Sequence, residues 1–98
     1  MNIDAIHKAL ANPVRRDILQ WLKEPHQYFS HQVHNLDAGV CAGLIDARTG
    51  LSQSTVSAHL AALQRANLVT SQRVGQWIFY KRNEETIKTF LAHMTTGL

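Results

Sequence analysis

The sequence predicts one mainly helical domain with a single β-hairpin, arranged in the order of a winged helix-turn-helix. Three observations predict it: several short segments with apolar residues at helical spacing, a glycine bend at Gly50 that leads into a helix with a narrow apolar stripe, and aromatic and β-branched residues on both sides of Gly75. The 98 residues, 45% of them apolar, suffice for one compact domain over residues 1–98 with a small core.

Two helices are expected before a long connection. An apolar stripe over about 3–11 predicts the first helix. Asn12 is a good N-cap and Pro13 suits the first helical position, so a second helix is expected from there to about residue 23. Pro25 should end this helix. Residues 25–39 show no sustained periodicity and predict a connection that is long for so small a domain.

The middle of the chain predicts two more helices. One is expected over about 40–49, where Gly50 suits the C-terminal cap. The next is expected over about 53–66, because the hydroxyl of Ser52 can cap the free amides of its first turn. Its inward stripe has three apolar residues at i, i+4 and i+7, namely Val56, Leu60 and Leu63. A helix held from behind in this way can enter a DNA groove, as a recognition helix does.

A hairpin and a last helix complete the chain. Residues 69–82 predict two strands that turn at Gly75. A helix is expected over about 84–95, and its apolar stripe is too broad for a helix on the edge of a small domain. Together with the first helix it would leave an apolar patch on a monomer, which predicts a partner subunit. The patch consists of Ile3, Ile6, Leu10, Ile87, Leu91 and Met94, with Phe90 beside it.

Charge and cysteine usage limit the function classes. The net charge of +3 and the pI of 9.4 favour a polyanionic partner, and the basic excess is local, because residues 67–82 carry three basic residues and no acid. The single cysteine, Cys41, excludes an internal disulfide and suits a reducing compartment. The N-terminus is not typical of a signal peptide, and the longest apolar run, over about 38–45, is too short to span a membrane. We therefore expect a cytoplasmic protein without a membrane partner.

Three segments in this order resemble the ArsR-type (arsenic-repressor-like) family of bacterial winged-helix transcription regulators. They are Leu10–Leu19, Gly50–Leu60 and Gly75–Tyr80, and the resemblance covers nearly the whole chain. It implies a homodimer formed through the first and last helices. It also implies binding to an imperfect inverted repeat in double-stranded operator DNA, and repression until an effector binds. The resemblance does not identify the effector.

The metal sites of this family have no counterpart in the sequence. The resemblance aligns the Cys-x-Cys motif of many members with Cys41 and Gly43, of which only the first is a thiol. The last helix has His93 without the acidic and histidine residues of the family's other common site. Because one thiolate cannot complete the three or four ligands that a soft metal needs, we expect no metal site and no cofactor.

Cys41 has three interpretations. It is a half-buried small residue without a function, which we favour, or a redox or electrophile sensor if its surroundings depress its pKa. It is a metal ligand only if the preceding connection folds back over the third helix and supplies His31, His34 or Asp37.

The candidate DNA-binding residues lie on the outer side of the 53–66 helix and at the tip of the hairpin. They are Gln53, Ser54, Thr55, Ser57, Ala58, His59, Arg73 and Gln76. Glutamine can pair bidentately with adenine, and serine or threonine can serve bases or phosphates. For His59, covering the helix surface is an equal alternative, and Lys81 and Arg82 can be phosphate contacts or charged strand ends.

The sequence favours two other function classes less. A winged helix can also serve as a protein-interaction or dimerisation module without DNA binding, although the local basic excess at the hairpin argues against this alternative. An enzyme has no support, because no nucleophile, base and orienting group coincide. Ser57 and His59, for example, are two residues apart on a helix and do not face each other.

Overall fold

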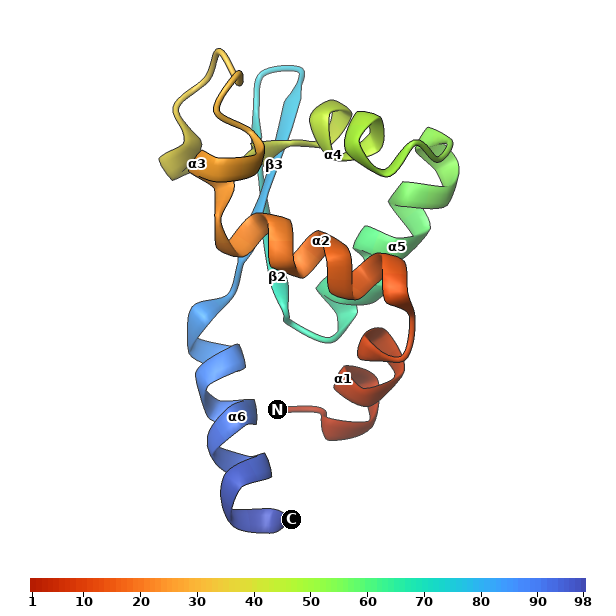
Figure 1. The fold of residues 1–98 in the computed structure, drawn as a ribbon, viewed down its shortest axis with the longest axis vertical. Helices are drawn as coiled ribbons and strands as arrows, with labels where there is room; N and C mark the ends of the chain where they lie inside the picture. Colours follow the sequence, from red (N-terminus) through yellow and green to blue (C-terminus); the bar gives the residue numbers. More distant parts are fainter.

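The computed structural model describes residues 1–98 as a helical domain with one small sheet (Figure 1). The elements in chain order are α1 (Ile3–Leu10), α2 (Pro13–Lys23), α3 (Pro25–Tyr28), the 3-10 helix η1 (Leu36–Ala38), β1 (Val40–Cys41), α4 (Ala42–Thr49), α5 (Gln53–Arg65), β2 (Val69–Val74), β3 (Trp77–Arg82) and α6 (Glu84–Gly97). The predicted winged helix-turn-helix is confirmed: α4 and α5 are its two helices and the β2–β3 hairpin is its wing. None of the helices has both the length and the apolar character that crossing a membrane requires.

The predicted caps explain why the helices begin and end where they do. The side-chain carbonyl of Asn12 accepts hydrogen bonds from the amides of Val14 and Arg15 at the start of α2. Gly50 ends α4 in the left-handed conformation, with φ of 71°, which costs glycine little. Ser52 then caps α5 by accepting from the amide of Thr55.

The sheet has a third strand that the sequence analysis missed. Strands are ordered β1-β3-β2, all antiparallel, and β1 pairs Val40 with Tyr80 and Cys41 with Phe79. The helix predicted over 40–49 therefore begins two residues later than expected. Gly39 precedes this strand with φ of 113°, and a Cβ there would come within 2.7 Å of the carbonyl oxygen of Tyr80. The close approach of the two backbones thus requires glycine at this position.

The connection over 25–39 is more ordered than the sequence indicates. Pro25 ends α2 as expected, but it also begins the short helix α3, because proline suits a first helical position. Phe29 follows α3 and is buried, which anchors the connection to the core. The connection then passes through η1 to β1, so it has local structure without the periodicity of a long helix.

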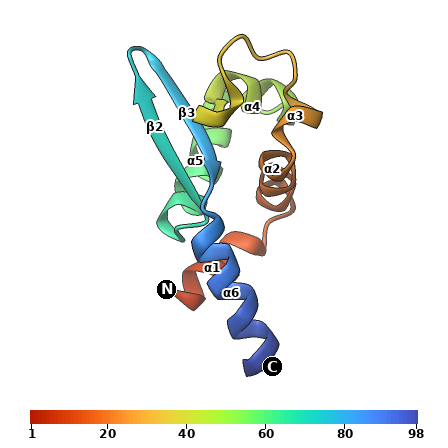
Figure 2. The same cartoon turned by 90° about the vertical axis from the view of Figure 1, so that its left-hand side faces the viewer.

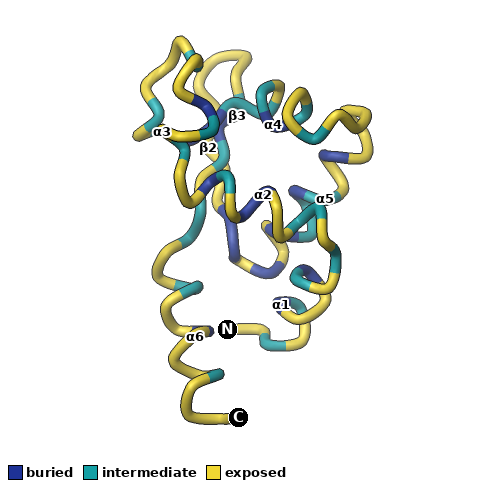
Figure 3. The backbone as a smooth tube through the Cα atoms, in the orientation of Figure 1, coloured by how far each residue is buried: buried dark blue, intermediate teal, exposed yellow.

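The core lies between α1, α2, α5 and the base of the wing (Figure 3). Its fully buried members include Ile18, Ile45 and Leu60. Ile6 is also fully buried, and this corrects the expectation that it lies in an exposed patch. The reason is that α1 packs across α5, so one side of α1 is covered by the chain itself.

The two ends of the molecule carry different elements (Figures 1 and 2). The tip of the wing and α4 lie at one end, whereas α1, α6 and both termini lie at the other. Helix α6 projects away from the body, which makes the molecule 41 Å long but only 25 and 24 Å across. Only one residue of α6, Phe90, is buried.

Candidate nucleic-acid interface

Helix α5 is divided into a buried and an exposed side, as predicted. Its apolar stripe is buried almost completely, with relative exposures of 0 or 1% for Val56, Leu60 and Leu63. The residues on its outer side are all exposed; they are Gln53, Ser54, Thr55, Ser57 and Ala58. The first turns of α5 therefore present short, uncharged polar groups on a helix that the core supports from behind.

The first turn of α5 is ordered by its own hydroxyl groups. The Oγ of Ser52 accepts from the amide of Thr55 at 3.3 Å and donates to its Oγ1 at 2.8 Å, and the Oγ of Ser54 lies 3.3 Å from the Oγ of Ser52. No acidic residue stands in this turn. The positive end of the helix dipole is therefore not neutralised by the chain and is open to a phosphate.

His59 differs from the prediction, because it is half-buried rather than exposed. Its Nδ1 accepts a hydrogen bond of 3.1 Å from the Nε of Arg15 on α2. Partial burial, and then the positive charge of Arg15, lower the pKa of His59. His59 follows Val56 by three residues and precedes Leu63 by four, so helical spacing puts it at the edge of the buried side. This side chain joins α5 to α2.

The tip of the wing matches the prediction. The hairpin turns through Gly75 and Gln76, with a positive φ of 62° at Gly75, and Arg73 pairs with Ile78 just below the turn. Arg73 and Gln76 are both exposed. The side chain of Arg82, in contrast, is only 13% exposed and donates to the carboxylate of Glu84 at 2.9 Å. Arg82 is thus a paired residue at the end of the strand.

A helix cap at Asn67 and a side-chain hydrogen bond, neither of which the sequence predicted, join the end of α5 to the wing. Asn67 adopts the left-handed conformation, with φ of 59°, directly after α5. Its amide donates to the carbonyl of Gln64 and the next amide, of Leu68, donates to Leu63, which is the Schellman arrangement. The side chain of Gln64 also donates to the hydroxyl of Ser71 on β2 at 2.7 Å. Asparagine just after a helical stripe was the available signal for this cap.

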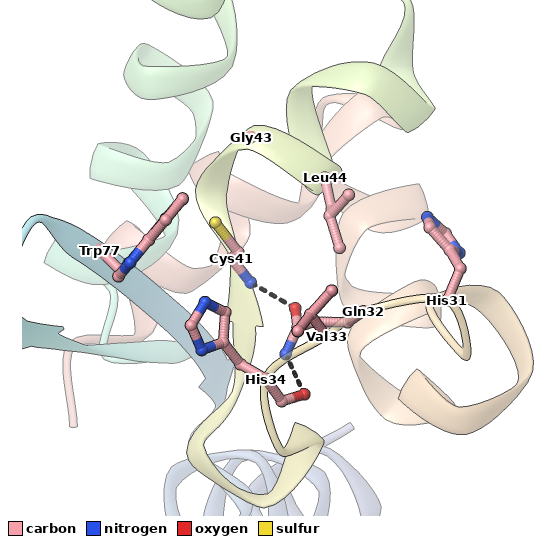
Figure 4. A pocket seen from close by; sticks show the side chains of 8 residues that line it. All are labelled: His31, Gln32, Val33, His34, Cys41, Gly43, Leu44 and Trp77. Atoms are coloured by element: carbon pink, nitrogen blue, oxygen red, sulfur yellow. Dashed lines mark hydrogen bonds between the residues drawn. The ribbon is translucent and has the colours of Figure 1, made fainter.

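Cys41 is half-buried and lies beside a pocket (Figure 4). The connection does fold back over the start of α4: the side-chain oxygen of Gln32 accepts from the amide of Cys41 at 2.8 Å. His34 lies near Cys41, whereas His31 lies across the pocket from it. Asp37 is exposed and does not line this pocket. No three histidine, cysteine or acidic side chains are grouped closely enough to hold a metal ion.

The candidate dimer residues differ widely in exposure. Leu91 is 57% exposed, whereas Phe90 is buried within the chain and meets the ring of His7 edge-on, with centroids 5.8 Å apart. The half-buried members are Ile3, Leu10, Ile87 and Met94. Leu91 is therefore the residue of this set with the most surface left to cover, and Ile6 and Phe90 already belong to the core.

Comparison with known proteins identifies the family. Residues 10–72 match a family model described as a helix-turn-helix domain. The matched residues include α2, α4, α5 and most of β2. The helix-turn-helix-type transcriptional regulator YbzH of Bacillus subtilis is 43% identical over 84 residues, which are 84% of this chain and 84% of that protein. The putative arsenical resistance operon repressor ArsR2 of Halobacterium salinarum is 35% identical over 78 residues, which are 80% of this chain and 56% of that protein.

A solved structure agrees with these matches. The structure of HlyU from Vibrio cholerae superposes with a TM-score of 0.63 at 31% identity and covers 96% of this chain and 90% of that one. Because it covers 96% of this chain, the superposition extends beyond residues 10–72 of the family model to β3 and most of α1 and α6. The chain therefore belongs to the helix-turn-helix transcriptional regulators of the ArsR type.

Proposed function

We propose that this regulator binds an inverted-repeat operator in double-stranded DNA as a homodimer and represses the adjoining genes. Two copies of α5 would enter successive major grooves about 34 Å apart, and each wing would lie on the flanking backbone. Base recognition would come from Gln53, Ser54, Thr55 and Ser57, whereas Arg73 and Gln76 at the wing tip would hold the phosphate backbone. Its place of action would be the compartment that holds the DNA, the cytoplasm.

The exposed polar side of α5 carries this proposal. Five neighbouring residues, over 53–55 and 57–58, have no partner elsewhere in the fold except the hydroxyl network with Ser52. The neutral donors and acceptors of the four polar residues among them suit base edges, and the acid-free first turn suits a phosphate. The chain carries a net charge of +3, and Arg73 adds an exposed positive charge at the wing tip. A protein-interaction module does not require an exposed polar helix face, an acid-free first turn and a basic wing tip together.

The projecting helix α6 supports the dimer. Helix α6 has 14 residues, of which only one is buried, and its Leu91 is exposed. Packing within the chain therefore contributes little to the stability of this helix. A second copy of α1 and α6 would cover Leu91 together with the half-buried Ile87 and Met94. In this arrangement both copies of α5 could face the same side of the DNA, which an inverted repeat requires.

Two substitutions separate base recognition from backbone binding. Gln53→Ala should weaken operator binding by roughly 5- to 150-fold, because a bidentate base contact contributes about 1–3 kcal/mol, and should leave binding to unrelated DNA nearly unchanged. Arg73→Ala should weaken binding to the operator and to unrelated DNA alike. It should also reduce the slope of log K against log salt concentration by about 0.9 for each phosphate contact that is lost. Fluorescence anisotropy with labelled duplexes over a range of salt concentrations measures both effects.

The matched controls are Gln20→Ala and Lys23→Ala, exposed residues of similar character on α2. Both should bind as the wild type does. Equal losses for Gln53→Ala and Arg73→Ala on both DNAs would contradict the proposed division of roles. The absence of any saturable binding at low salt would favour the alternative, a protein-interaction module.

The role of Cys41 as a sensor stays a prediction. Its thiol is half-buried beside the pocket of Figure 4, so a small oxidant or electrophile has a path to it. Operator release by such a reagent in the wild type, and its loss in Cys41→Ser, would support sensing. Equal responses of the two proteins would show that the thiol is not the sensor.

A further inference from the structure

A pocket of about 430 Å³ lies where three segments meet (Figure 4). His34 and Val33 come from the connection, Cys41 and Leu44 from β1 and α4, and Trp77 from the start of β3. The volume lies within the range of pockets that hold small molecules. The pocket is separate from the outer side of α5, where the base contacts are proposed.

The lining is mostly apolar and aromatic, and the side chain of Gln32 finds its hydrogen-bond partners within the chain. The side-chain amide of Gln32 donates to the carbonyls of His34 and Gly39 at 3.2 and 3.1 Å, and its oxygen accepts from Cys41. No lysine, arginine or acidic residue lines the pocket. A charged ligand would therefore find no permanently charged partner beside the two histidines of the lining, which favours a neutral molecule.

A short series of aromatic rings indicates the shape of the ligand. The ring of His34 lies 5.2 Å from the rings of both Trp77 and Phe79, in tilted and edge-on arrangements. Trp77 remains 42% exposed and Val33 97% exposed at the rim of the pocket. A planar aromatic molecule could join this cluster of rings and cover apolar surface that is otherwise in contact with water.

We propose that this pocket binds a small, neutral aromatic molecule and that its occupancy changes operator affinity, the second part resting on the proposed DNA-binding function. Trp77 begins the strand that follows the tip of the wing, and α4 packs against α5. A ligand held between Trp77 and Leu44 bridges the wing and the helix-turn-helix. It therefore acts on the spacing between the two elements that are proposed to contact DNA.

Gly43 allows a direct test, because it lines the pocket and a Cβ added there meets no atom within 4 Å. In Gly43→Phe the added ring should occupy the space without a clash, whereas Gly43→Ala also replaces the helical glycine but leaves the pocket open. The probe is 1-naphthol, followed by saturation-transfer NMR and by the fluorescence of the protein. The wild type and Gly43→Ala should bind it alike, and Gly43→Phe about tenfold or more weakly.

His34→Ala provides a second variant that leaves α4 untouched. Removal of the central ring should weaken naphthol binding while the circular dichroism of the protein stays unchanged. Wild-type protein that does not bind the probe, or equal binding by the wild type and Gly43→Phe, would overturn the proposed site.

The operator arm of the experiment tests the coupling. Naphthol should shift the operator affinity of the wild type and of Gly43→Ala, but not that of Gly43→Phe. Naphthol binding without any shift in operator affinity would overturn the regulatory part of the proposal. If the protein binds no duplex even without naphthol, the proposed function is refuted. The naphthol-binding data would then still decide whether the pocket binds an aromatic molecule.

Discussion

The end of the molecule that is proposed to face DNA and the end formed by α1 and α6 differ in how the fold supports them. Helix α5 is supported by three buried residues, tied to α2 through His59 and Arg15, and tied to the wing through the Asn67 cap and the bond between Gln64 and Ser71. Helix α6 has one buried residue, a cap by Asn83, and the edge contact between Phe90 and His7.

The proposed partners, DNA at one end and a second copy of the chain at the other, explain why α5 makes more contacts within the chain than α6. A surface that recognises a base sequence has to keep its shape before binding, since ordering it during binding would reduce affinity. The chain therefore braces α5 and the wing with its own hydrogen bonds. A surface that meets a second copy of itself can leave part of its packing to that copy. Three predictions test this contrast.

The largest effect is expected at the α6 end. Leu91→Lys should raise the dissociation constant of the dimer by roughly a hundredfold or more, because an unpaired charge would have to leave water at the interface. Sedimentation velocity at micromolar concentration measures the shift from dimer to monomer. Thr89→Lys is the control, since a residue two positions earlier on a helix lies on nearly the opposite side. A wild type that sediments as a monomer would refute the dimer.

A smaller effect is expected at the join between α5 and the wing. Asn67→Ala should reduce the free energy of unfolding by about 1–2 kcal/mol, because alanine is strained in the left-handed conformation that Asn67 adopts. Asn67→Gly tolerates this conformation and should stay close to the wild type. Urea unfolding at one protein concentration measures the free energy of unfolding of the wild type and of both variants. An alanine variant as stable as the glycine variant would mean that the cap does not brace the wing.

The smallest effect is expected from His59, whose side chain is only half-buried. Its pKa is lowered from 6.5, so below that pH the unfolded chain binds more protons than the folded one. The contribution of neutral His59 to stability is therefore complete above about pH 6.5 and declines as the pH falls toward the lowered value. Urea midpoints of the wild type and His59→Gln, measured from about pH 7.5 to about 5, should converge in acid. Parallel curves would rule out this link between α5 and α2.

The candidate site was predictable to the extent that it depends on helical spacing. The stripe of Val56, Leu60 and Leu63 implied which residues of α5 face outward, and the turn at Gly75 implied a wing with Arg73 near its tip. The sequence prediction places His59 on the outer side, although the same spacing puts it at the edge of the buried side. The sequence prediction also places Ile6 in an exposed patch, because the sequence does not show that the apolar stripe of α1 packs against α5.

The sequence by itself determined the local features: the caps at Asn12, Ser52 and Gly50, the apolar stripes and the hairpin turn. Each of these depends on groups within a few residues of one another, so the pattern of neighbours is enough to predict it. Only the tertiary structure decided that Val40 and Cys41 form a strand, since this pairing joins residues about 40 positions apart and two residues have no periodicity. The pocket between the connection, α4 and Trp77 exists for the same reason: its walls are distant in sequence and meet only when the chain is folded.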